Sequence, residues 1–553
     1  MSPVGTIISA ASLPPVQKSK SLPKAQPTRL GTHRSVMGSK IKTTERLGHA
    51  PLNEQQIPER ALGLWVSLAI TLGALLRLAL YLRNRSLWYD EALLALNILH
   101  RPFAGLFDTL DYHQGAPIGF LLLEKLATKI GGGSELVLRF MPLLFGIGAL
   151  FLFSQVAQTC LSRGAAPLAV LLFAINEPLI YYSSEVKQYS CDVAITLFLL
   201  WAIVRFLHSE MRIRSFCEIG LLGAAALWFS HPASFFLAGS SVVLLLAVWR
   251  KSSAYLVRIV WIFALWGISF ALLYLLSLRG LGEDRVLADF WHNYFPPHIF
   301  WSLETAQWLA DRGLTVLGDP RGLSTVLSAA LFAAGCGALI LKIKGDFVWL
   351  ISSACFMTLL ASYLHKYPLA ERLLLFAVPI ALLGVAEGAT WLADTILRSA
   401  AARFGLVVLL LAQPVWLVTH SVISPRRPDD IKPAIDYILA HQQAGDAWYI
   451  YSQAQYQFRY YADLRHLTIN VHVGANCAED QSCYKADLDS LQKPRRVWVL
   501  FSHILVREQT DEEQIVLSQL NRMGTRQDEK RSPGARAYLY DLSAQAANLS
   551  PKP

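Results

Sequence analysis

Long apolar runs recur along most of the chain, and they constrain its fold more than any other feature. A helix can cross the hydrocarbon core of a bilayer when about 17 to 25 consecutive residues are mostly apolar. With 54% hydrophobic and only 16% charged residues, the composition is typical of a multispan membrane protein. The runs that we interpret as spans are Ala61–Leu82, Val137–Ala157, Ala166–Tyr182, Cys191–Leu207, Phe216–Ser230, Ala233–Trp249, Ile259–Leu278, Leu323–Leu341, Phe347–Leu364, Leu373–Leu397 and Phe404–His420. The sequence therefore predicts an α-helical polytopic protein with about eleven transmembrane helices.

The segment Pro117–Ile130 is apolar but short, and it carries Glu124, Lys125 and Lys129. Counting it as a span would reverse the side of every later loop. Without it, the basic residues of the later connections fall on the side of the N-terminus, as the positive-inside rule expects. These residues are Arg163, Arg205, Arg212, Arg214, Arg250, Lys251, Arg258, Lys342, Lys344, Arg398 and Arg403. We therefore expect an interfacial helix here, with the N-terminus cytoplasmic and the C-terminus outside.

The two ends of the chain differ from its middle. Residues 1–60 are rich in Ser, Pro and Lys and carry no acid before Glu45, which predicts a disordered basic cytoplasmic tail. A targeting segment of similar composition is the alternative. We divide the remainder into a membrane domain at 61–424, a soluble outer-side domain at 425–545 and a tail at 546–553.

The soluble part alternates helix and strand patterns. We predict helices in DDIKPAIDYILAHQ, AQYQFRYYADL and DEEQIVLSQLNRMG and strands in DAWYIYS, RRVWVLFSH and ARAYLYDL. This alternation favours a small α/β domain, and the absence of a glycine-rich phosphate loop argues against a nucleotide site. Cys477 and Cys483 are candidates for a disulfide if the compartment is oxidising.

Two adjacent acids, Asp90 and Glu91, follow the first span in SLWYDEALLALNI. The amphipathic run after them is typical of a helix lying on the membrane, which would hold the acids at the bilayer surface. A pair of solvated loop acids below an aromatic belt is the plain alternative. We interpret Asp90 as a candidate catalytic residue, with Glu91 beside it.

The next outer loop, YYSSEVKQYSCD, places Glu185, Lys187, Tyr189 and Asp192 between two spans. Ionisable groups at the edge of a membrane are functional candidates by default, although a local Glu–Lys pair would also explain them. Lys187 suits a phosphate as a point charge.

Further polar residues fall in the outer loops. Arg372 could clamp a phosphate with two parallel hydrogen bonds, or lie in the interface with its charge in water. Asp111, His113 and His231 are candidates for acceptor contacts, as is Asp192. Histidines and acids on one face also leave a divalent metal open as a cofactor.

Taken together, these loops suit the transfer of a group from a lipid-linked phosphate. Cations would stabilise the phosphate leaving group, and a carboxylate would take the proton of the acceptor hydroxyl.

Four stretches resemble the GT-C superfamily of glycosyltransferases that use polyprenyl-phosphate sugars, and especially the branch of protein O-mannosyltransferases and lipid A aminoarabinose transferases. They are WYDEA, YHQGAPIGFLLLEKL, SSEVKQYS and YPLAERLLLFAVPIALLGVAEG, within Leu64–Leu397. The resemblance implies that Asp90 is the general base and that Glu91 assists it or binds metal. It also implies that Glu185, Lys187 and Asp192 line the donor phosphate and the acceptor. The chain departs from this group at Ala116, where a second proline is common, and at Lys187, where arginine is common.

The sequence thus predicts an integral membrane glycosyltransferase that moves a sugar from a polyprenyl-phosphate donor to a lipid-linked, glycan or protein acceptor. The resemblance implies direct attack with inversion at the anomeric carbon, and a bacterial inner membrane fits best. A transporter or flippase for a lipid-linked sugar is the first alternative, and a polysaccharide ligase or polymerase is the second. A transporter would favour internal repeats and charges at the midplane. No nucleic acid is expected as a partner despite the net charge of +10.

Overall fold

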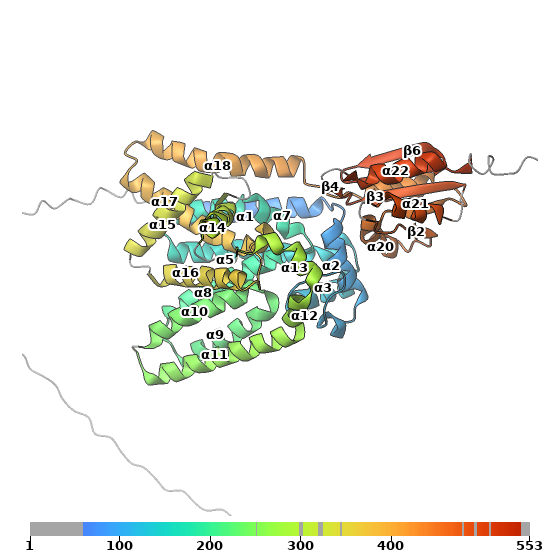
Figure 1. Cartoon of the computed structure of the whole chain (residues 1–553). Helices are drawn as coiled ribbons and strands as arrows, with labels where there is room; N and C mark the ends of the chain where they lie inside the picture. The colour runs from blue at the N-terminus through green and yellow to red at the C-terminus, as the bar shows by residue number, and fades with distance from the viewer. Residues whose placement is uncertain are drawn as a thin grey trace, which may run out of the picture. The chain divides into compact units, whose positions relative to one another are not determined.

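A computed structural model describes residues 59–249, 251–297, 302–318, 325–342, 345–477, 480–491, 495–507 and 510–543. Helices dominate the part that precedes residue 424 (Figure 1). The longer ones are α1 (Glu59–Leu82), α5 (Phe140–Cys160), α6 (Ala165–Ala174), α8 (Tyr189–Leu207), α9 (Ile213–Phe229), α10 (Pro232–Trp249), α11 (Ser253–Leu273), α14 (Leu303–Gly318), α15 (Thr325–Leu341), α16 (Gly345–Tyr363), α17 (Val378–Thr395) and α18 (Ala400–Ile423). Nearly all of the predicted tail at 1–60, and the tail at 546–553, lie outside the described residues.

Each of the eleven predicted spans coincides with helix in the described residues, so the chain is a polytopic membrane protein. Eight helices of the described part are long and apolar enough to cross a membrane, and a bent pair makes a ninth. The other two predicted spans correspond to α9 and α15, which have 17 residues each. Their main buried residues belong to one hydrophobic cluster with those of α1, α5, α8, α10 and α17.

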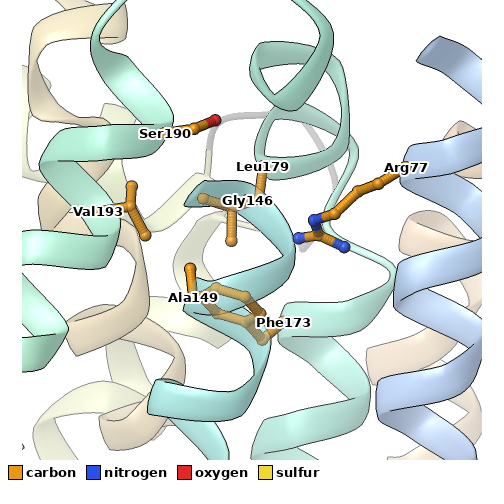
Figure 2. A pocket seen from close by; sticks show the side chains of 7 residues that line it. All are labelled: Arg77, Gly146, Ala149, Phe173, Leu179, Ser190 and Val193. Atoms are coloured by element: carbon orange, nitrogen blue, oxygen red, sulfur yellow. The ribbon is translucent and has the colours of Figure 1, made fainter. Parts of the chain in front are cut away.

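One predicted span, Ala166–Tyr182, is broken rather than straight. Helix α6 ends at Ala174, and α7 (Glu177–Tyr181) continues at an angle of 55°. Asn176 caps α7 and Pro178 follows in its first turn, which favours a new helix start over continuation of α6. The buried guanidinium of Arg77 on α1 donates to the carbonyl of Ala174 at 3.3 Å and also borders a small cavity (Figure 2). A cation at a helix C-terminus offsets the negative end of the helix dipole.

The connection between α1 and α5 contains short helices that are too short to cross a bilayer. They are α2 (Tyr89–His100), α3 (Ile118–Gly131) and α4 (Glu135–Leu138), with a single 3₁₀ turn at Ala104–Leu106. Helix α3 has 14 residues, as an interfacial helix would. Lys125 on this helix is buried, and its ammonium donates to the carbonyls of Ile98 and Leu99 at 2.7 and 2.9 Å. The charge within α3 is therefore compensated by the C-terminal end of α2.

Glu124 of α3 provides a test of this packing. Its carboxyl is fully buried, neither oxygen has a hydrogen-bond partner in the described part of the chain, and burial raises its pKa well above the ordinary value. The folded protein thus retains a proton that the unfolded chain loses near pH 4 to 5, so stability should fall as the pH rises above that range. We expect Glu124→Gln to melt at a higher temperature than wild type at pH 8–9, with the difference shrinking toward pH 5. Thermal unfolding in detergent measures this, and a constant difference at all pH values would contradict it. Glu210→Gln, at an exposed acid, is the control.

The soluble part is a five-stranded mixed sheet with the order β2-β1-β3-β7-β6. Strands β1 (Ala447–Ile450), β2 (Val471–Val473) and β3 (Arg496–Ser502) are parallel neighbours, whereas β7 (Ala535–Asp541) runs antiparallel to β3 and to β6 (Thr525–Ser532). The helices are α19 (Lys432–His441), α20 (Gln455–Leu464), α21 (Gln481–Asp489) and α22 (Glu512–Met523). All six predicted elements are present. The small ladder of β4 (Val506–Arg507) and β5 (Thr510–Asp511) was not predicted, nor were β2, α21 and β6.

The sheet has a buried centre and a polar edge. Strand β3 is buried at nearly every position, which explains its continuous apolar run. Edge strand β6 reads TRQDEKRS and is mostly exposed, and charges of this kind discourage pairing with other chains. Cys477 and Cys483 form a disulfide with a Cα–Cα distance of 5.6 Å. The sheet's core is continuous with buried residues of α2 and α3.

Candidate active site

Asp90 and Glu91 lie in the first turn of α2, and they serve different partners. Adjacent residues of a helix project about 100° apart, so two neighbouring acids cannot face the same group. The carboxylate of Asp90 contacts Lys187 Nζ at 3.0 Å and Arg372 Nη1 at 2.7 Å. Its side chain is 15% exposed. Burial alone would raise the pKa of Asp90, but the charges of Lys187 and Arg372 outweigh it and lower the pKa below the ordinary value.

Glu91 is fully buried and saturated with hydrogen bonds. Arg139 donates to its two oxygens at 2.8 and 2.6 Å, and the backbone N–H of Val186 donates at 2.8 Å. Because Val186 immediately precedes Lys187, Glu91 joins the loop that carries Asp90 to the loop that carries its partner. Its geometry is that of a positioning residue, and not that of a group free to contact a substrate or a metal.

Lys187 and Arg372 come from segments far apart in the sequence. Lys187 lies between the 3₁₀ turn Tyr182–Ser184 and α8, and Arg372 lies in the 3₁₀ segment Glu371–Ala377 that precedes α17. The ammonium of Lys187 also donates to Gln114 Oε1 at 2.6 Å. Arg372 is 22% exposed, and its guanidinium lies over the ring of Trp291. Of these two cations, Lys187 is therefore buried and Arg372 is partly exposed.

Glu185 lies behind this group, beside Arg85. Neither of its oxygens has a hydrogen-bond partner in the described residues, and Arg85 Nη2 is 4.0 Å away. Burial first, and then the negative charges of Glu91 and Asp90, raise the pKa of Glu185 to about 7. Tyr189, one turn along, is buried and packs edge-on against Tyr182.

The cluster has an excess of positive charge. It contains the cations Arg85, Arg139, Lys187 and Arg372 and the carboxylates Asp90, Glu91 and Glu185. The excess grows when Glu185 takes up a proton. A partly buried site of this kind attracts an anion, because the low dielectric strengthens each charge interaction.

Segments that follow α18 contact the chain just before Asp90. The hydroxyl of Tyr461 accepts a hydrogen bond from the N–H of Leu87 at 2.8 Å, and Asp429 accepts one from the N–H of Tyr89 at 3.2 Å. The ring of His503 stacks on Tyr89 with 4.3 Å between centroids. The soluble part therefore fixes the start of α2 through both its backbone and a side chain.

The remaining candidates do not contact Asp90. Asp111 pairs with Arg101 at 2.8 Å, and His113 contacts Asp284 at 2.7 Å. Asp192 and His231 are placed at the start of α8 and between α9 and α10, where Asp192 Oδ1 and His231 Nε2 are buried without hydrogen-bond partners among the described residues. Sequence reasoning missed Gln114, Arg85 and Arg139. The first stands in a quoted motif, but the two arginines carry no local signal, because long-range pairing defines them.

The histidines and acids of the outer loops leave a divalent metal open as a cofactor, and the geometry of the site tests this. In the described ranges, no three His, Cys, Asp or Glu side chains are grouped so that they could hold a metal ion. Asp90 has a cation on each oxygen and Glu91 has no free lone pair directed outward. The donor set as it stands does not fit a divalent ion, and we derive no step through one.

The described helices define a polytopic membrane protein, and its fold is similar to that of solved ArnT structures. ArnT from Cupriavidus metallidurans in the apo state is similar over 89% of this chain and 99% of its own, with a TM-score of 0.53 and 13% identity. ArnT from the same organism bound to undecaprenyl phosphate is similar over 87% of this chain and 98% of its own, with a TM-score of 0.52 and 13% identity. The Archaeoglobus fulgidus oligosaccharyltransferase in complex with zinc and sulfate covers 78% of this chain and 67% of its own, with a TM-score of 0.47 and 12% identity. At such identities the likeness concerns the fold. No family model and no curated protein matches the chain.

Proposed function

We propose that this protein is an integral membrane glycosyltransferase that takes its sugar from a polyprenyl-phosphate donor. The observation that carries the proposal is the carboxylate of Asp90 held between Lys187 and Arg372. One site then holds a proton acceptor and two cations, the groups that this reaction needs. The undecaprenyl phosphate bound to the similar ArnT structure supports a lipid phosphate as the ligand.

The reaction is a single displacement. The acceptor oxygen forms a bond to the anomeric carbon while the bond from that carbon to the phosphate oxygen breaks, so the configuration inverts. The acceptor's proton passes to Asp90, and the departing polyprenyl phosphate is stabilised by Lys187 and Arg372.

Donor binding would also activate Asp90. With both cations on its carboxylate, Asp90 is a weak base, as its lowered pKa shows. A phosphodiester that draws Lys187 and Arg372 toward itself removes part of that stabilisation and raises the basicity of Asp90. The base would thus gain strength when the sugar is in place.

The positive-inside pattern of the sequence supports a site on the outer side, with the N-terminus in the cytoplasm and the soluble part outside. A bacterial inner membrane is the proposed location. The acceptor would be a lipid-linked molecule, a glycan or a protein, because the Asp90 geometry requires only a nucleophilic hydroxyl.

The first experiment supplies protein in nanodiscs with a panel of polyprenyl-phosphate sugars and a crude envelope extract, and follows the release of free polyprenyl phosphate. We expect release by wild type, and Lys187→Met and Arg372→Met should each weaken donor binding by about tenfold or more, because each removes a charge-assisted contact. Arg279→Met, which removes an exposed ion pair, is the matched control. Binding of donors without any release would favour the transporter alternative, and absence of both would contradict the proposal.

Glu185 gives the reaction a pH dependence. Because burial raises its pKa to about 7, Glu185 is neutral below that pH and negative above it. The new charge would compete with the donor phosphate for the cations, so donor affinity should fall as the pH rises through 7. A polyprenyl-phosphate sugar is a phosphodiester and keeps its own charge over this range, so the change belongs to the protein. Glu185→Gln should flatten the profile from pH 6 to 8.5, and an unaltered slope in that variant would assign the titration to another group.

A further inference from the structure

The helix that carries Asp90 takes its N-terminal cap from the soluble part of the chain. The first N–H groups of a helix have no partner within it, so a capping side chain usually supplies one. Trp88 precedes α2, but its indole cannot accept a hydrogen bond and its side chain forms no cap. The N–H of Tyr89 instead donates to the carboxylate of Asp429 at 3.2 Å, from 340 residues away. Asp429 is thus a cap that only the tertiary structure brings to α2.

Further contacts hold Asp429 in this place. It is buried, and its Oδ2 atom, which accepts from Tyr89, also lies 3.1 Å from Nδ1 of His503. The ring of His503 stacks on that of Tyr89 with 4.3 Å between centroids. His503 follows β3 with a φ of 51°, a left-handed conformation that residues other than glycine rarely adopt. Such strain persists where surrounding contacts define the conformation, so Asp429, Tyr89 and His503 form one interlocked group.

This cap acts on the turn that holds the proposed base. A carboxylate at a helix N-terminus stabilises both an unbonded N–H and the positive end of the helix dipole, so its loss frays the first turn. Asp90 is the second residue of α2, and its carboxylate lies between Lys187 and Arg372. A reacting group displaced by about 1 Å can lower a rate by about 10²-fold. Fraying would therefore misplace the base while both cations remain available to the donor.

We propose that Asp429 is a positioning residue for Asp90, so that the soluble part sets the rate of transfer by capping α2. The inference rests on the proposed function and gives the soluble part a task in it. Asp430 provides an internal comparison, because it is also buried and its carboxylate accepts from the hydroxyl of Ser86, three residues before α2 begins. It ties the soluble part to the same segment without contacting the helix.

The first measurement separates the rate of transfer from the binding of phosphate. It uses full-length protein in nanodiscs and compares single-turnover release of polyprenyl phosphate from the donor panel with equilibrium binding of undecaprenyl phosphate. We expect Asp429→Ala to lower the rate by about tenfold or more and to leave the affinity within about twofold of wild type. Asp429→Asn should keep at least about a third of the rate, because its amide oxygen can still accept from the N–H of Tyr89. Asp430→Ala, the matched control, should stay within about threefold of the wild-type rate.

The second measurement reports on the cap without any activity. Hydrogen–deuterium exchange is followed in peptides that cover residues 88–93, the start of α2. Exchange there should be about tenfold faster in Asp429→Ala than in wild type, and close to wild type in Asp429→Asn and Asp430→Ala. If Asp429→Ala does not fold, His503→Phe takes its place, since it keeps a ring against Tyr89 but loses the contact with Asp429. It should lower the rate by about fivefold.

Three results would overturn the inference. They are an equal loss of rate in Asp429→Ala and Asp430→Ala, an affinity for undecaprenyl phosphate that falls together with the rate, and unchanged exchange at the start of α2. The first would mean that both residues merely dock the soluble part. A wild type that neither binds undecaprenyl phosphate nor releases it from any donor would instead contradict the proposed function, and the exchange data would then show separately whether Asp429 caps α2.

Discussion

Replacing Asp90 by Asn should reduce the turnover of glycosyl transfer by about 10²–10⁴-fold, the range expected when a general base is removed. Donor affinity should stay the same or rise, because the amide no longer neutralises Lys187 and Arg372 and both cations become available to the phosphate. Single-turnover release of polyprenyl phosphate gives the rate of the chemical step, and equilibrium binding of the donor gives the affinity. A loss in rate that accompanies a gain in affinity separates a base from a residue that merely holds the loop.

Asp108→Asn is the control for this experiment, because Asp108 is an exposed acid in the same connection between α1 and α5. It should leave both the rate and the donor affinity within twofold of wild type. Wild-type turnover in Asp90→Asn would contradict Asp90 as the base, and Glu185, the next carboxyl in the cluster, would then be the candidate.

Replacing Arg139 by Met should destabilise the protein by about 3–5 kcal/mol, the usual effect of leaving one partner of a buried ion pair alone. Glu91 would keep its charge at a fully buried position and lose two of its hydrogen bonds. Arg139 also donates to the carbonyls of Arg85 and Ser86 at 2.7 and 3.1 Å, so the segment before Asp90 would loosen as well. The melting temperature in detergent and the yield of monodisperse protein on size-exclusion chromatography measure the effect.

Two further variants show whether the charge is the cause. Arg214→Met breaks an exposed ion pair with Glu218 and should change stability by at most about 1 kcal/mol. The double variant Glu91→Leu with Arg139→Met removes both charges and should be more stable than Arg139→Met alone. A double variant as unstable as the single one would show that the shape of the site, and not its charge, limits stability.

Much of the membrane domain could be predicted from the sequence because a bilayer restricts the backbone conformations that a spanning segment can adopt. Every backbone polar group must be paired within the hydrocarbon, so a run of apolar residues long enough to cross is a helix. The break in Ala166–Tyr182 is the exception. The polar pair Asn176 and Glu177 and the following proline favour a new helix start, but the 55° bend and the contact of Arg77 with the carbonyl of Ala174 are seen only in the tertiary structure.

The soluble part also contains elements that could be predicted from the sequence and elements that could not. Strand β3 has a continuous apolar run and is evident, whereas β6 has the composition of a loop and becomes a strand only because β7 offers it a partner. Short-range patterns identify elements that bury themselves on two faces. They do not identify an edge strand whose side chains remain in water.

The sequence by itself determined the membrane spans, the two loops that carry Asp90 and Lys187, and the residue types suited to a lipid phosphate. Only the tertiary structure decided which partners Asp90 and Glu91 each have, and therefore which of the two can act as a base. Asp90 and Glu91 are neighbours in sequence, but one helical step sends Asp90 toward Lys187 and Arg372 and Glu91 toward the buried Arg139. The partners come from positions 48 to 282 residues away, and no local pattern encodes a contact of that range.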